Sequence, residues 1–299
     1  MSRIGLFTVL LVIVFAHPLQ GQDSSGVTMV GSIGEEWDEV RAVSVVGDYA
    51  YVAAGMDGLR IVGIQNPQNP SEIAHYDPVD YFSWDVSVAG GYAALANEYV
   101  YNGYISRILL IDVSNPQNPR LSREYRPYEA PQSVFIMGSH AFAGIGTRLD
   151  IIDFSGDFVG AYDTQGNILE ITGSGDFIYL ADWGSGLRII DISNPEEPDE
   201  VGYFDTDGYS WGVAVDGDYA YVADWDAGLR VIDISDPSEP DEIGYCDSPG
   251  YAHDVDVRNG FAYLADGVSG LRVLDISTPQ DPYEIGYYDT PGDALEVSI

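Results

Sequence analysis

The chain has 299 residues and a formal net charge of -36 at pH 7, from 48 acidic and 12 basic residues. Every basic residue is arginine, and the sequence offers no basic patch for the phosphates of a nucleic acid or for an anionic membrane surface. Hydrophobic residues make up 45% of the chain, which is enough to bury a core and excludes a disordered polyanion. The charge therefore lies on a folded surface and leaves cationic partners and divalent cations as candidate ligands.

The first 21 residues have the pattern of a secretory signal peptide. Arg3 precedes an apolar run from Ile4 to Ala16, and a polar segment ends near Gly21. The run is too short to span a bilayer, and no later segment is apolar for about 18 residues, so we expect no transmembrane segment in the mature chain. We predict a signal peptide at residues 1–21, a single domain at 22–299, and a secreted, extracellular or cell-surface location.

A repeated motif organises the rest of the chain. GLRIIDIS from Gly186 returns as GLRVIDIS from Gly228 and as GLRVLDIS from Gly270, and each copy precedes a loop with two prolines. Each unit of about 42 residues divides into four short runs rich in β-branched and aromatic residues, separated by turn-forming residues. Looser copies of the motif begin at Gly58, Ile108 and Leu149.

Four strands in each of several repeats are typical of a β-propeller. One four-stranded sheet cannot cover both of its apolar faces, so each sheet must stack on its neighbours as a blade. We predict an all-β fold, a β-propeller of four-stranded antiparallel blades, with six complete blades plus strands of a partial seventh. Residues 27–33 resemble a fourth strand, and residues 291–297 match the start of the preceding repeat at 249–255. Two alternatives stay open: a C-terminally truncated seven-bladed protein, or six blades whose ends overlap.

The motif LRVID at Leu229, with its copies at Leu187 and Leu271, resembles the repeat of the LVIVD-type β-propellers. The resemblance covers residues 27–299 and is weaker in the first and third repeats. It implies an exported bacterial or archaeal protein, secreted or at the cell surface, and no common reaction. Trp-Asp pairs also occur, for example at Trp84 and Trp225, but none ends a third strand. We therefore interpret them as chance rather than as WD40 repeats.

The residues at the entry to the innermost strand differ between repeats, whereas the framework residues recur. Because antiparallel strands alternate in direction, these entry positions share one face of the propeller, around the mouth of the central channel. Varied aromatic and polar groups on a repeated framework are typical of a binding surface. The candidate ligand-binding residues at this mouth are Trp84, Asp85, Glu170, Trp211, His253 and Asp254.

The second repeat carries a longer loop, Asn97 to Arg107, on the same face. Its Tyr99, Tyr101 and Tyr104 are further candidate ligand-binding residues, because tyrosine rings stack on sugars and on partner proteins. A hairpin that is merely longer is the alternative.

An aspartate follows the second strand in three repeats, as Asp182, Asp224 and Asp266. These carboxylates are weak candidates for a Ca²⁺ site. The alternative, which their identical placement favours, is that they accept backbone N–H bonds and hold the turns. The arginine of the repeated motif is expected to pair with neighbouring acids.

Motifs for catalysis are missing from the sequence. It contains no GxSxG elbow and no P-loop, its four histidines occupy unrelated repeat positions, and we assign no catalytic residue. The sequence favours a secreted or cell-surface binding or scaffold module, with a protein or carbohydrate as its partner. The alternative is an extracellular hydrolase or lyase with a Ca²⁺-assisted site at the channel mouth. Ca²⁺ is the one cofactor considered, and the sequence leaves the ligand and the oligomeric state open.

Overall fold

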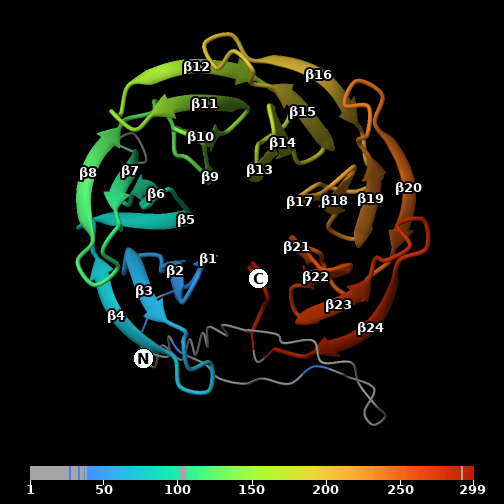
Figure 1. Ribbon diagram of the computed structural model, residues 1–299, viewed down its shortest axis with the longest axis horizontal. Coiled ribbons are helices and arrows are strands. Elements are labelled where there is room, and N and C mark those ends of the chain that lie inside the picture. Colours follow the sequence, from blue (N-terminus) through green and yellow to red (C-terminus); the bar gives the residue numbers. More distant parts are fainter. Residues whose placement is uncertain (1–26, 28–32, 34–36, 38, 102–105, 291) are drawn as a thin grey trace.

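A computed structural model describes residues 27, 33, 37, 39–101, 106–290 and 292–299, so the predicted signal peptide lies outside the described residues. In the described part, 24 strands form six four-stranded antiparallel sheets that surround a central axis as blades (Figure 1). The predictions of an all-β fold and of a propeller with six blades are therefore confirmed. None of these residues belongs to a helix that is long and apolar enough to cross a membrane.

Within each blade the strands follow one another outward from the axis in chain order (Figure 1). The first three blades are β1 (Ala42–Val46), β2 (Tyr49–Ala53), β3 (Leu59–Gly63) and β4 (Ser71–Tyr76); β5 (Tyr81–Ala89), β6 (Tyr92–Tyr99), β7 (Arg107–Asp112) and β8 (Arg120–Tyr125); and β9 (Ser133–Met137), β10 (His140–Ile145), β11 (Arg148–Asp153) and β12 (Phe158–Asp163). The other three are β13 (Glu170–Ser174), β14 (Phe177–Ala181), β15 (Leu187–Asp191) and β16 (Asp199–Phe204); β17 (Gly212–Asp216), β18 (Tyr219–Ala223), β19 (Leu229–Asp233) and β20 (Asp241–Cys246); and β21 (Asp254–Arg258), β22 (Phe261–Ala265), β23 (Leu271–Asp275) and β24 (Tyr283–Tyr288).

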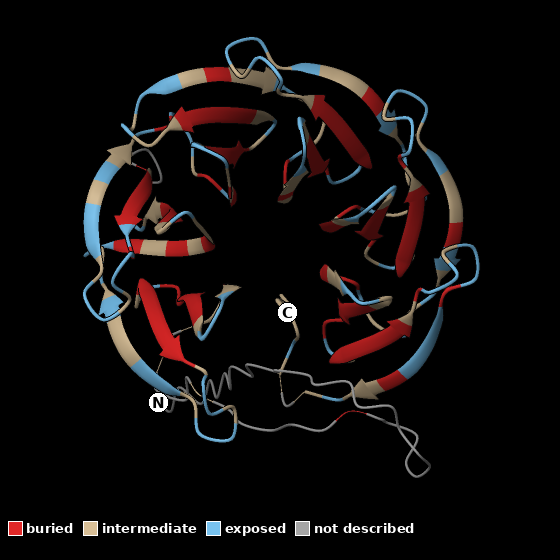
Figure 2. Cartoon of the chain, viewed as in Figure 1, coloured by how far each residue is buried: buried red, intermediate tan, exposed pale blue. Residues whose placement is uncertain are grey.

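The core lies between the blades, on the faces of their second and third strands. Figure 2 shows the third strands as buried and the outermost strands as a mixture of buried and exposed residues. Between blades 5 and 6, for example, Leu229 and Val231 pack in one cluster with Val255 and Leu264. Burying each such side chain contributes about 1.5–3 kcal/mol, so blade stacking is the main source of stability.

Each outermost strand is bent at the same place. The register between the third and fourth strands shifts at a β-bulge in every described blade, for example between Val231 and Ile232. A bulge adds one unpaired residue and increases the local twist. The repeated bulge thus curves the outer strands into the rim seen in Figure 1.

Neighbouring blades are also joined near the axis by side chains that accept backbone N–H bonds. Asp85 Oδ2 in β5 accepts from Val134 N in β9 at 2.6 Å. Two residues further along β5, Ser87 Oγ accepts from Ile136 N at 3.0 Å. These bonds fix the innermost strand of one blade against the innermost strand of the next.

Between β21 of blade 6 and β1 of blade 1, the C-terminal residues 292–299 take the place of an innermost strand (Figure 1). Asp254 Oδ2 accepts from Val297 N at 2.8 Å, and Glu296 Oε1 accepts from Val43 N at 2.9 Å. These contacts match those between complete blades. The described residues here form no strand, and the predicted partial seventh blade is not present as a sheet.

Candidate binding face

The loops between second and third strands and the linkers between blades share one face of the propeller, which we call the linker face. The loops of blades 4, 5 and 6 are each tied to the segment that follows their own blade by a β-bridge between single residues, and Gly55 in the loop of blade 1 bridges to Ser83 in β5. Trp183 in the loop of blade 4 bridges to Ser210, and Trp225 in the loop of blade 5 bridges to Ala252. The linkers are therefore held against the loops in a repeated geometry.

A buried aspartate at the end of the second strand holds each of three linkers in place. We call Asp182, Asp224 and Asp266 the frame aspartates, and all three are fully buried. Asp224 accepts from Thr206 Oγ1 at 2.6 Å and from Gly208 N at 2.9 Å. The same pair of bonds, from a hydroxyl and a glycine N–H, recurs at the other two aspartates.

The linker passes so close to the frame aspartate that it needs a glycine. A Cβ atom on Gly208 would lie 2.4 Å from the carbonyl oxygen of Asp224, a backbone atom that cannot move aside. Burial raises the pKa of Asp224, while its bonds to Thr206 and Gly208 oppose the rise. These hydrogen bonds are those expected if the frame aspartates hold the turns, the alternative to a Ca²⁺ site. In the part of the chain that the structure describes, no three His, Cys, Asp or Glu side chains are placed to hold a metal ion.

The arginine of the repeated motif extends this framework outward. Arg230 is 8% exposed, and its Nε lies 3.8 Å from Asp224 Oδ2, the distance of an ion pair rather than of a hydrogen bond. Its guanidinium also lies 3.7 Å from Glu242 and 5.0 Å from the centre of the Tyr245 ring. The same set recurs around Arg188 and Arg272. The expected pairing with neighbouring acids is confirmed.

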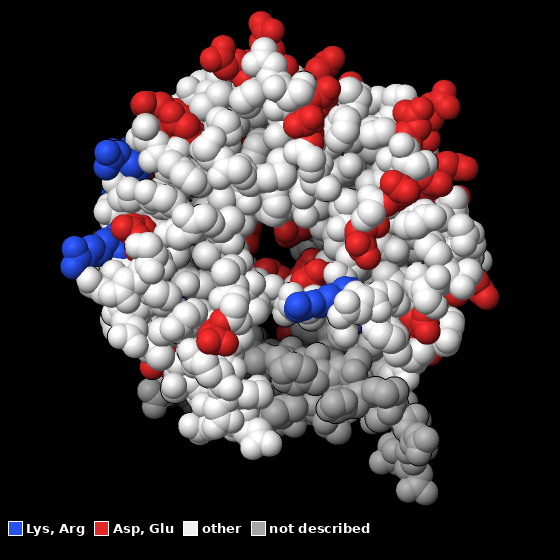
Figure 3. Space-filling model, in the orientation of Figure 1, with Lys and Arg blue, Asp and Glu red and all other residues white. Residues whose placement is uncertain are grey.

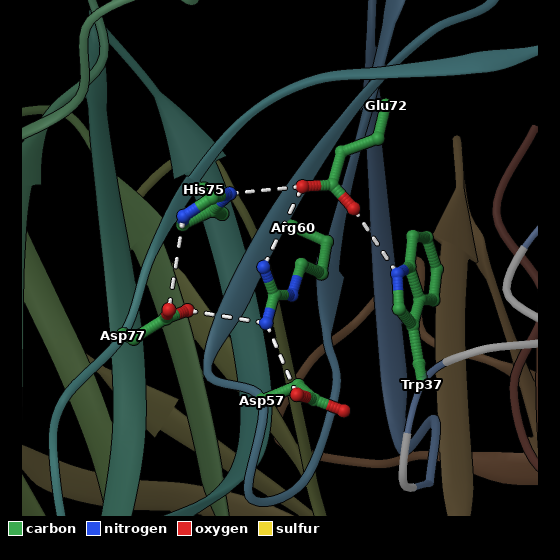
Figure 4. A network of polar contacts seen from close by, with 6 residues as sticks. All are labelled: Trp37, Asp57, Arg60, Glu72, His75 and Asp77. Atoms are coloured by element: carbon green, nitrogen blue, oxygen red, sulfur yellow. Dashed lines mark hydrogen bonds and ion pairs between the residues drawn. The ribbon is translucent and has the colours of Figure 1, made fainter.

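Blade 1 has alanine at the frame-aspartate position and surrounds its arginine with other carboxylates (Figure 4). Arg60 lies 3.1 Å from Asp57, 3.2 Å from Asp77 and 3.5 Å from Glu72. His75 stands where the later repeats have tyrosine, and its ring nitrogens face Glu72 at 2.9 Å and Asp77 at 3.7 Å. Glu72 pairs with the arginine as Glu242 does in blade 5, so blade 1 differs in Asp57, which stands in for the missing frame aspartate.

The linker face of blades 4 to 6 carries two groups of aromatic side chains in contact. Trp225 stacks on Trp211 with ring centres 4.7 Å apart, and on Tyr251 with centres 4.6 Å apart. His253 meets the rings of Trp211 and Trp225 edge-on at 5.0 and 4.9 Å. One blade earlier, Trp183 stacks on Tyr209 at 5.3 Å. We call these six residues the aromatic arc; Trp183, Tyr209 and Tyr251 are 44–48% exposed.

Two tryptophans of the arc adopt a backbone conformation that favours glycine. Trp183 and Trp225 have φ of 46° and 51°, and the matching positions in blades 1 and 6 are Gly55 and Gly267, with φ of 53° and 55°. A residue with a side chain pays about 1–2 kcal/mol for this left-handed conformation. Blades 4 and 5 therefore place a tryptophan, exposed in blade 4 and partly buried in blade 5, where the framework itself would favour glycine.

The predicted candidates in blade 2 lie apart from the arc. Trp84 is the extra residue of a bulge between β5 and β6, and its Nε1 donates to Glu98 at 2.9 Å. Tyr99 ends β6 and meets Tyr101 edge-on at 5.5 Å. Because β6 extends to Tyr99, part of the long loop is an extended hairpin; Tyr104 lies outside the described residues.

The remaining candidates belong to a group near the axis that we call the inner-ring carboxylates: Asp85, Glu170, Asp254 and Glu296. Figure 3 shows a hollow at the centre of the propeller with acidic residues in its wall. Burial raises the pKa of Asp85 to about 6 and that of Asp254 to about 7. Burial and the charges of these two aspartates raise the pKa of Glu170 well above its usual value. Asp85 and Asp254 also bond to the next inner segment, so they belong to the framework.

The arc brings together Trp211 and His253, which the sequence singled out, with four residues that it did not. Those four are Trp183, Tyr209, Trp225 and Tyr251. The sequence did contain a sign that Trp183 and Trp225 matter, because the same repeat position holds glycine in blades 1 and 6 and tryptophan in blades 4 and 5. Their contact with the linkers depends on the bridges between loop and linker, which the sequence alone does not give.

The fold and the linker face define a β-propeller with partly exposed aromatic side chains on one face. The family model described as LVIVD repeat matches residues 39–78, 82–126, 165–206, 207–248 and 249–290, which span blades 1, 2, 4, 5 and 6. These matches cover more than half of the chain, so the protein belongs to the LVIVD-repeat family, as its sequence motifs predicted. No curated protein matches the chain.

Solved structures share the fold at low sequence identity. U3-55K has a TM-score of 0.70 at 9% identity, over 88% of this chain and 85% of that one. A chain of the mitotic checkpoint complex has a TM-score of 0.68 at 11% identity, over 99% and 90%. The computationally designed Ika8 protein has a TM-score of 0.64 at 8% identity, over 84% and 76%. At these identities the likeness concerns the fold alone.

Replacing Asp224 by alanine should destabilise the protein by about 3 kcal/mol, measured by urea unfolding, because Arg230 and the linker N–H would lose a buried partner. The exposed neighbour Asp226 is the matched control, and its alanine variant should stay within about 0.5 kcal/mol of wild type. Added Ca²⁺ should leave the wild-type unfolding curve unchanged. A strong stabilisation by Ca²⁺ would instead assign the frame aspartates to an ion site.

The raised pKa values of the inner-ring carboxylates predict a pH-dependent stability. Between about pH 4 and pH 7 the native state keeps protons that the unfolded chain has released, so the free energy of unfolding should fall as pH rises. Asp254→Ser introduces the residue found at Ser133 in blade 3. It should reduce the slope of the free energy of unfolding against pH by the equivalent of up to one bound proton. Asp112→Ser is the control, because the exposed Asp112 has a lowered pKa through Ser114. Equal slopes for wild type and Asp254→Ser would contradict the assignment.

Proposed function

We propose that this protein is an exported binding module that recognises its partner through the aromatic arc on the linker face. The observation that carries the proposal is a pair of tryptophans, the exposed Trp183 and the partly buried Trp225, at positions where glycine suits the backbone. Strained residues persist where the surrounding structure holds them in place, and they concentrate at functional sites. Tryptophan and tyrosine are also the residues that most often dominate the energy of binding surfaces.

The rest of the molecule supports a scaffold for this surface rather than a reaction centre. The frame aspartates are saturated by linker donors, and Asp85 and Asp254 join neighbouring inner segments. The carboxylates considered for a Ca²⁺-assisted hydrolase or lyase therefore have framework roles in this geometry. The candidate residues Trp84, Tyr99 and Tyr101 belong to separate aromatic contacts, of Trp84 with Phe82 and of Tyr99 with Tyr101, and are a proposed extension of the binding surface.

An exported location, secreted or at the cell surface, is part of the proposal. Its support is the sequence pattern of residues 1–21, together with the acidic, lysine-free composition, which suits a solvated surface outside the cell. A protein or carbohydrate partner at the cell surface fits this location.

We also propose that the C-terminal segment acts as the innermost strand of a seventh blade position. It forms the bonds that inner strands form elsewhere, and Val27, Val297 and Ile299 pack together against blade 6 at Leu271 and Val273.

The double variant Glu296→Ala/Ser298→Ala tests this closure, because it removes the acceptors of the Val43 and Val45 N–H groups. Each unpaired buried donor costs about 1–3 kcal/mol, so hydrogen exchange at these two amides should become at least tenfold faster. Ser238→Ala, in an exposed turn, is the control. Unchanged exchange in the double variant would refute a closing role for the segment.

The variants Trp183→Gly and Trp225→Gly test the binding surface, because each introduces the glycine found at the same position in blades 1 and 6. Relief of backbone strain should offset the lost ring stacking, so the free energy of unfolding should stay within about 1 kcal/mol of wild type. Wild type and the double variant would be compared on arrays of oligosaccharides and peptides. Wild-type hits should weaken at least about tenfold in the double variant.

Tyr283→Ala on the outer strand β24 removes an exposed ring from a distant surface and should leave the same hits unchanged. The proposal fails if wild type binds nothing on the arrays, or if its hits survive the double substitution. A large loss of stability in the glycine variants would instead show that the tryptophans support the fold.

A further inference from the structure

The loops and linkers that carry the aromatic arc contain carboxylates and no basic side chain. Residues 182–186, 205–212, 224–228 and 247–254 contain seven aspartates and neither lysine nor arginine. Among these aspartates, Asp205, Asp207, Asp226 and Asp247 are exposed, and Asp205 pairs with Arg188. The nearby Arg188 and Arg230 are buried and paired with acids. A negatively charged ligand would meet no compensating charge here, whereas a cationic ligand would meet several.

On the other side of the channel mouth, the chain itself places a cation on an equivalent aromatic pair. The Cζ atom of Arg41 lies 4.7 Å from the centre of the Trp84 ring and 5.4 Å from that of Phe82, and Glu39 pairs with this guanidinium at 2.7 Å. Aromatic faces attract guanidinium groups electrostatically at such distances. One face of this propeller therefore already shows an arginine held between aromatic rings and a carboxylate.

The repeat relates this occupied pair to the arc. Phe82 and Trp84 flank Ser83 in β5, which bridges to Gly55, and Tyr209 and Trp211 flank Ser210, which bridges to Trp183. Among the described residues, the motif arginines Arg188, Arg230 and Arg272 of blades 4 to 6 lie over outer-strand tyrosines and not over the rings of the arc. The arc thus repeats the aromatic part of the arrangement without an internal cation.

His253 does not supply that cation at neutral pH. Burial lowers the pKa of its ring, although the charge of Asp293 opposes the change. The imidazole is therefore neutral at pH 7, and its edge contacts with Trp211 and Trp225 are contacts of an uncharged ring.

We propose that the aromatic arc binds a cationic peptide segment, whose arginine or lysine side chains lie over the exposed rings and pair with Asp207 and Asp226. This inference rests on the proposed function, since it names the ligand class of the same surface. It accounts for the aromatic rings, the surrounding carboxylates and the absence of basic residues from these loops together.

The test uses the full chain and two defined probes, a hexa-arginine peptide and the neutral oligosaccharide cellohexaose, in titrations followed by tryptophan fluorescence and calorimetry. Hexa-arginine should bind wild type, and its affinity should be at least about fivefold lower for Trp183→Gly/Trp225→Gly. Its affinity for Asp207→Asn/Asp226→Asn should fall by a similar factor, and added salt should lower the affinity further. The control Asp236→Asn/Asp241→Asn removes the same charge from the opposite face and should change the affinity less than about twofold.

Each alternative outcome contradicts a particular step. If both charge variants weaken hexa-arginine equally and the glycine variants do not, the peptide responds to net charge alone and the inference fails. If cellohexaose binds in a tryptophan-dependent way and hexa-arginine does not, the binding face stands and its cationic ligand is wrong. If neither probe binds wild type, the cationic ligand class is rejected, and the array comparison of the glycine variants decides separately whether the face binds anything.

Discussion

The structure depends on carboxylates that accept hydrogen bonds from backbone N–H groups in the neighbouring part of the ring. The frame aspartates do this at the linkers, where Asp224 receives Gly208 N, and Asp85 does it near the axis, where it receives Val134 N. Each blade is a separate sheet, so hydrophobic stacking alone would leave blades free to slide. Directional bonds to backbone donors fix their relative position. Much of the acidic composition lies at the surface (Figure 3), while a smaller part of it holds the ring together.

Much of the fold follows from the sequence because each repeat is a local unit. Turn residues such as Gly217 and Asp218 close a tight hairpin, and paired prolines separate the third and fourth strands, so the strand order is set within about 42 residues. The six blades were predicted correctly for this reason. The closure between blades 6 and 1 joins distant parts of the chain, and there the pattern of residues 291–297 predicted a strand where the structure describes only a hydrogen-bonded segment.

The candidate site was only partly predictable. Trp211 and His253 stand out because their repeat positions vary, but Trp225 was set aside as a chance Trp-Asp pair. Its importance depends on a tertiary fact, the bridge that brings the loop of blade 5 between two linkers. The inner-ring carboxylates are the opposite case, in which residues predicted to bind a ligand have framework contacts. Asp85 and Asp254 vary between repeats as binding residues do, yet the structure gives them bonds that join blades, because neighbouring inner strands leave N–H groups that a carboxylate can satisfy.

The left-handed turn shared by Gly55, Trp183, Trp225 and Gly267 has a consequence for how such proteins diversify. The same backbone geometry holds either glycine or tryptophan, and the strands on both sides of the turn keep the same arrangement. A propeller of this kind can alter its specificity blade by blade through single substitutions, with the remaining blades as a constant support. The same property makes this turn a natural position for randomised libraries, in which new recognition surfaces are selected on a ring that already folds.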